Sequence, residues 1–75
     1  MTRHADRPRT ADIGGRTCHL HRRPSGNVIV ETDALTRTVR PSNGARVFQA
    51  MLGLDASATR LLDTAIRCTA SGVES

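Results

Sequence analysis

The clearest pattern along the chain is the helical spacing of apolar residues in its last third. Six of them recur at intervals of three and four, so they share one face of an amphipathic helix. Asp55 or Ser57 can cap its start, and Gly72 can end it in the left-handed conformation. Asp63 and Arg67 stand four apart with the acid first, which stabilises a helix surface. The six apolar residues are Ala58, Leu61, Leu62, Ala65, Ile66 and Cys68.

A shorter helix is predicted just before this one. Ser42 or Asn43 can cap it, and Gly53 stands where a C-terminal glycine ends a helix. With so short a connection, the two helices are expected to form a helical hairpin or a helix-turn-helix corner. The apolar stripe of the shorter helix consists of Val47, Phe48, Met51 and Leu52.

The pattern changes to strand periodicity between residues 16 and 32. Cys18 and Leu20 alternate with His19 and His21, and a β-branched run follows at residues 28–32. The intervening Pro-Ser-Gly-Asn sequence at 24–27 is typical of a turn, so a β-hairpin is predicted. Residues 35–40 favour a third strand, the alternative being a one-turn helix ended by Pro41.

Residues 1–15 contain Pro8, Gly14 and Gly15 with scattered charges, and Ile13 is their only large apolar residue apart from Met1. This composition predicts a disordered basic arm. The expected fold is therefore α+β: an arm at 1–15, then one small domain at 16–75. In that domain an antiparallel hairpin or three-stranded meander packs on a C-terminal two-helix hairpin.

The core of such a domain is thin. The chain has 75 residues, and Phe48 is its only aromatic residue. Small chains bury too little apolar surface to offset chain entropy comfortably. Self-association, as a homodimer, or a partner is therefore expected.

The charge is distributed unevenly. The net charge of +4 lies in the first 23 residues, because residues 24–75 contain five arginines and five acids. Arginine binds phosphate and carboxylate groups bidentately, so we expect either nucleic acid or an acidic protein as the partner. A solvated, solubilising tail is the simpler alternative. The nucleic-acid-binding candidates are Arg3, Arg7, Arg9, Arg16, Arg22, Arg23, Ser57, Thr59 and Arg60.

The segment Phe48–Ser57, which contains Leu52 and Gly53, resembles the turn region of helix-turn-helix DNA-binding proteins. The resemblance implies a regulatory DNA-binding role, with Ser57, Thr59 and Arg60 at the start of the helix that faces DNA. It spans about ten residues, and Gln49 and Thr59 depart from the small and aliphatic residues of that pattern. Ribbon-helix-helix proteins also place a strand before two helices, but Pro41 shortens the first helix here. An ordinary helical hairpin is the alternative.

Neither a cofactor, a metal site nor a catalytic site is expected. On a strand, Cys18 points away from His19 and His21, so the three cannot share one zinc ion. No pair of acids suits acid–base catalysis, and neither cysteine has an oriented base, so a non-enzymatic protein is expected. Without a signal peptide or a membrane-spanning run, the expected location is cytoplasmic, with free cysteines.

Overall fold

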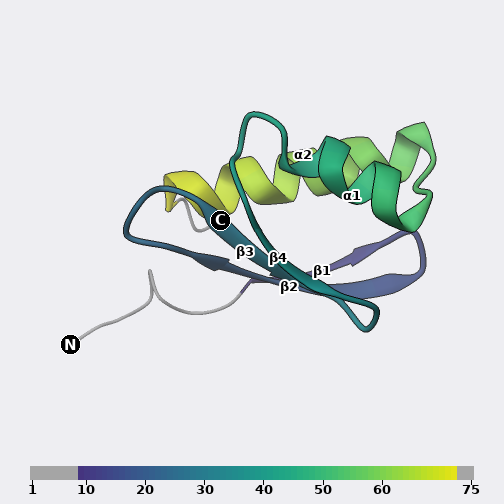
Figure 1. Cartoon of the computed structure of the whole chain (residues 1–75), viewed down its shortest axis with the longest axis horizontal. Helices are drawn as coiled ribbons and strands as arrows, with labels where there is room; N and C mark the ends of the chain where they lie inside the picture. Colours follow the sequence, from purple (N-terminus) through teal and green to yellow (C-terminus); the bar gives the residue numbers. More distant parts are fainter. Residues whose placement is uncertain (1–8, 73–75) are drawn as a thin grey trace.

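A computed structural model describes residues 9–72 (Figure 1), which form a four-stranded antiparallel sheet followed by two helices. This is the α+β architecture that the sequence predicts. The elements are β1 (Arg9–Ile13), β2 (Arg16–Arg22), β3 (Val28–Glu31), β4 (Thr36–Val39), α1 (Gly44–Leu52) and α2 (Ala56–Ser71).

The sheet is a meander in the order β1-β2-β3-β4. The predicted hairpin is confirmed as β2 and β3, in which Leu20 lies opposite Val30. The third strand, preferred over a one-turn helix, is confirmed as β4. Thr32 fixes the turn between β3 and β4, since its hydroxyl donates to the Leu35 carbonyl and accepts from the Ala34 and Leu35 amides.

The strand β1 corrects the expectation that all of residues 1–15 form a disordered arm. Residues 9–13 pair with β2 along their whole length, and Ile13, opposite Arg16, is 3% exposed. Gly14 and Gly15 have φ values of 61° and 82°, which suit the tight two-residue turn of a hairpin. The pair of glycines is thus a hairpin turn, where the sequence suggested a flexible segment. Residues 1–8 of the predicted arm lie outside the described residues.

Both helices lie on one side of the sheet (Figure 1). The core forms between this covered face and the helices, and α2 packs across β1, β2 and β3. The opposite face of the sheet is open and mainly polar, with His19, Glu31 and Thr36 in one cross-strand row. The largest fully buried side chains are Phe48, Leu20, Leu62, Ile66, Val28, Val30 and Cys18.

Three of the helix ends have the predicted caps, whereas Asn43, at the start of α1, makes no side-chain capping hydrogen bond. Asp55 is the N-cap of α2, and its side chain accepts a hydrogen bond of 2.8 Å from the Ala58 amide. Gly53 and Gly72 end α1 and α2 in the left-handed conformation. The two helices run side by side in opposite directions (Figure 1), which is the helical hairpin of the two predicted alternatives.

Two residues of the predicted apolar stripes are exposed. Leu61 is 55% exposed and Met51 is 45% exposed. The buried arc of α2 centres on Leu62 and Ile66, and Leu61 lies about 100° around the helix from Leu62. Since α1 packs on the other flank of α2, no described element covers Leu61.

Candidate nucleic-acid interface

Exposed arginines gather at one end of the sheet. The strands β2 and β4 run in the same direction on either side of β3, so their C-terminal ends lie together. Arg22 is the last residue of β2, Arg23 follows it, and Arg40 follows β4. Arg37 extends the group along β4. We call these four residues the basic end.

The backbone holds two of these arginines in place. The amide of Arg23 donates to the Asn27 carbonyl at 2.8 Å, which closes the turn between β2 and β3. The carbonyl of Arg40 accepts from the Gly44 amide at 2.7 Å, which leads the chain into α1. The side chains therefore project from ordered turns.

All four guanidinium groups of the basic end are available to a ligand. Among the described residues, none of them forms an ion pair or a side-chain hydrogen bond. Each of the four residues is exposed. Arg22 lies beside the C-terminal end of α2, because its Nη1 atom would be 3.1 Å from a Cβ atom on Gly72. That end of a helix favours a positive charge.

Four of the five described acids lie toward the other end of the sheet, although Glu31 pairs with Thr36 and is thus one residue along the sheet from Arg37. Asp12 is near the end of β1, Glu31 is the last residue of β3, and Asp33 is in the turn after β3, all toward the opposite end of the sheet. Asp55 precedes α2 at the same end. We call these four residues the acidic end. Arg16, at the start of β2, also lies at the acidic end. It forms an ion pair with Asp33, in which Arg16 Nη1 is 2.9 Å from Asp33 Oδ1. The charges of the folded domain are thus separated along the sheet.

The predicted binding residues divide between these regions. Arg9 is the first residue of β1 and pairs with Leu20, so it lies next to the strand that ends in Arg22 and Arg23. Arg16 lies at the acidic end in its ion pair, and residues 57–60 lie in the first turns of α2. Since α2 is about 22 Å from Ser57 to Gly72, the structure does not bring Ser57, Thr59 and Arg60 to the basic end. Arg3 and Arg7 lie outside the described residues.

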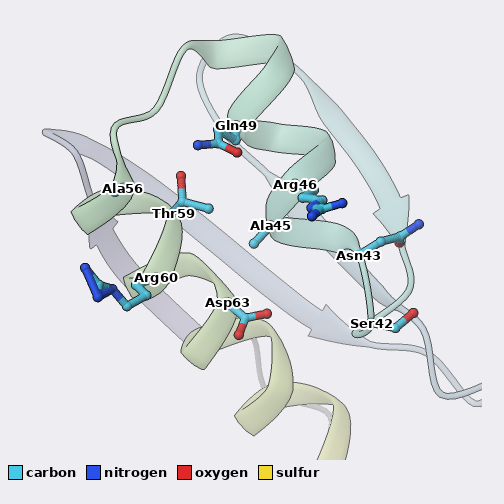
Figure 2. Close-up of a pocket in the computed structure, with 9 residues that line it drawn as sticks. All are labelled: Ser42, Asn43, Ala45, Arg46, Gln49, Ala56, Thr59, Arg60 and Asp63. Atoms are coloured by element: carbon cyan, nitrogen blue, oxygen red, sulfur yellow. The ribbon is translucent and has the colours of Figure 1, made fainter.

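A groove of about 480 Å³ lies between α1 and α2, on the side of the helices away from the sheet (Figure 2). Arg46 and Gln49 face it from α1, and Thr59 and Asp63 face it from α2, whereas the Arg60 side chain extends away from α1. Asp63 also binds Arg67, with an Nε–Oδ2 distance of 3.0 Å, as the sequence predicted. Because a carboxylate lies within it, the groove is less suited to phosphate than the basic end is.

The cysteines and histidines keep the alternation that the sequence indicated. Cys18 faces the helices and is 2% exposed, whereas His19 lies on the open face beside Thr10. Burial raises the pKa of the Cys18 thiol, and this opposes thiolate formation. Cys68 is half-buried, and both cysteines are free. In residues 9–72, no three Cys, His, Asp or Glu side chains gather as a metal ion would require.

Two residues of the basic end, Arg37 and Arg40, are missing from the predicted set. Over residues 24–75 the charges cancel, so the count along the chain gives no excess there. A signal was present in the similar sequences Arg-Pro-Ser-Gly-Asn at 23–27 and Arg-Pro-Ser-Asn-Gly at 40–44. Each follows a strand that ends at the same end of the sheet.

Comparison with protein-family models, with curated proteins and with solved structures gives no match for this chain. Neither helix within the described range 9–72 has the length and apolar character needed to cross a membrane. The functional argument therefore starts from the site itself.

Proposed function

We propose that this chain is a small non-enzymatic regulatory protein that contacts nucleic acid through its basic end. The observation that carries the proposal is the separation of charge along the sheet. Arg22, Arg23 and Arg40 lie at one end of the sheet with Arg37 two residues further in, all four exposed and without ion-pair partners among the described residues, while four of the described acids lie toward the other end. Guanidinium groups bind phosphate oxygens bidentately, and phosphate neutralisation releases counterions.

The N-terminal arm belongs to the same proposal. Arg9 is the first residue of β1 and pairs with Leu20 of β2. Residues 1–8 therefore join the domain beside the part of β2 that leads to the basic end. That segment of the sequence contains Arg3 and Arg7. Basic arms reach phosphates or the minor groove, so the arm and the basic end can act on one nucleic acid.

The experiment is fluorescence anisotropy of a labelled mixed-sequence DNA duplex and of a labelled single strand, each titrated with the full-length protein at low and moderate salt. The test variant Arg23→Ala/Arg40→Ala removes two charges from the basic end. The matched control Arg46→Ala/Arg60→Ala removes two charges from the helical hairpin. We expect binding that weakens steeply with salt, and a salt slope lowered by about two in the test variant.

The control variant should bind like the unmodified protein. No binding by the unmodified chain at low salt would refute the proposal. Equal weakening in the two double variants would also refute it, because net charge rather than the basic end would then determine the affinity.

The second candidate is an interaction module for an acidic protein. The observation that favours it is the mixed character of the groove, where Arg46, Gln49 and Asp63 can bind both charged and amide groups of a peptide. A pull-down in which Arg46→Ala/Arg60→Ala loses a protein partner, while Arg23→Ala/Arg40→Ala retains it, would support this candidate. Homodimer formation, expected from the thin core, is compatible with both candidates.

A further inference from the structure

Within residues 9–72, β1 is an edge strand, and no described element pairs with its outer side. Its pairing with β2 runs through all five residues from Arg9 to Ile13 without a bulge, and it contains no proline. In a hairpin closed by a two-residue turn, Ile13 and Arg16 exchange main-chain hydrogen bonds, and every second pair does the same. The main-chain groups of Thr10 and Asp12 therefore point away from β2. Native proteins usually protect such an edge or pair it.

We infer that a second copy of this chain pairs with β1, antiparallel, about a two-fold axis at Ala11. In this register Thr10 lies opposite Asp12 of the second copy, and the two residues exchange main-chain hydrogen bonds on both sides of the axis. Ala11 lies opposite Ala11 of the second copy. The interface is the same surface on both copies and joins two four-stranded sheets into one of eight strands.

The other edge of the sheet is unsuited to the same pairing. The Thr32 amide donates to the Leu35 carbonyl at 2.9 Å, so these residues occupy a hydrogen-bonded position of the ladder. By alternation the main-chain groups of Thr36 and Thr38 point outward from β4. A two-fold axis between those residues would place Arg37 directly opposite its own copy. Like charges in directly opposed positions destabilise a sheet, whereas β1 has alanine at the equivalent place.

The helix above β1 presents a matching apolar surface. Leu61, Ala65 and Cys68 lie on the flank of α2 that is turned away from α1, and α2 overlies β1. Leu61 is 55% exposed in the single chain. Pairing of the two β1 strands brings the two α2 flanks toward each other, so Leu61 becomes covered. The small side chains of Ala65 and Cys68 leave room for this approach.

The charges of two copies also complement each other in this arrangement. Because the paired strands run in opposite directions, the basic end of each copy lies toward the acidic end of the other. Asp12 then lies opposite Thr10 of the second copy, so the two Asp12 carboxylates do not face each other across the axis. The inference is independent of nucleic-acid binding, and its test contains no nucleic acid.

The test is the mass of the full-length chain in solution, measured by sedimentation equilibrium and by light scattering after size-exclusion chromatography. The unmodified chain should show twice its mass of 8.1 kDa. Thr10→Pro removes a donor from the open edge and leaves the pairing with β2 intact, so it should give the monomer mass. Leu61→Lys places a charge in the interface and should also give the monomer. Circular dichroism checks that both variants are folded.

Three variants serve as matched controls and should remain dimeric. Thr38→Pro removes an outward donor from the other edge, and Met51→Lys adds a charge at the other exposed apolar residue. Thr10→Val removes the Thr10 hydroxyl, which lies 3.3 Å from His19 Nδ1, but keeps the backbone donor. A monomeric unmodified chain overturns the inference. So does an open series of larger oligomers, or dissociation by Thr38→Pro to the same extent as by Thr10→Pro.

Discussion

At the scale of single residues, Gly44 shows how closely the elements meet. It is buried at the start of α1, and a Cβ atom placed on it would lie 2.5 Å from Val39 Cγ2 and 3.0 Å from Ile66 Cδ1. The hydrogen atom of glycine therefore lets α1 begin against both β4 and α2. In the sequence this residue was part of a turn signal, and the sequence pattern contains nothing that indicates its close contacts.

Gly44→Ala should destabilise the protein by about 1–3 kcal/mol, because the added methyl group overpacks the core. The same change at an uncrowded helical position would normally stabilise a protein. Urea denaturation of Gly44→Ala and of the exposed control Gln49→Ala measures the difference. Unchanged or increased stability in Gly44→Ala would show that α1 moves away from Val39 at no cost.

At the scale of elements, the periodicity of apolar residues predicted both helices, the central hairpin and the third strand. The two helices and the central hairpin each bury one regular face, and such a face leaves a repeating pattern in the sequence, whereas β4 buries only Val39. The strand β1 leaves almost none, because Ala11 and Ile13 are its only apolar residues. Its strand conformation depends on pairing with β2, which is a tertiary effect that local composition does not encode.

The neighbouring residues Leu61 and Leu62 test the assignment of the buried face of α2. Leu62 is 1% exposed, so Leu62→Ala should lower the free energy of unfolding by about 2–5 kcal/mol. Leu61→Ala should change it by less than about 1 kcal/mol, since an exposed side chain loses little contact. Thermal unfolding of both variants, at concentrations where each is monomeric, gives the comparison. Equal losses of unfolding free energy in the two variants would show that the buried face of α2 is centred between Leu61 and Leu62.

At the scale of the whole molecule, the candidate site depends on sheet topology. The count of charges along the sequence identified Arg22 and Arg23 but not Arg37 and Arg40. Arg37 and Arg40 lie near Arg22 and Arg23 only because β2 and β4 run in the same direction, with one strand between them. Conversely, Arg16 was counted as a binding residue, and its ion pair with Asp33 forms only when β2 lies near the turn after β3.

A pair of truncations tests whether the domain begins at β1. Removal of residues 1–8 leaves all four strands, so cooperative thermal unfolding should persist near the original temperature. Removal of residues 1–13 deletes β1 and with it buried Ile13, which should lower stability by at least about 2 kcal/mol. If the shorter chain unfolds at the same temperature as the longer one, β1 does not stabilise the domain.

The position of α2 at the end of the described chain has a consequence for biosynthesis. The four strands are translated first, and the apolar face of their sheet, with Leu20 and Val30 at its centre, has α2 as its main cover. Gly14, in the first turn of the sheet, packs against Ala58 of that helix. A ribosome must therefore complete residues 56–71 before the first hairpin acquires its cover. Until then the nascent sheet presents an apolar surface of the kind that chaperones bind.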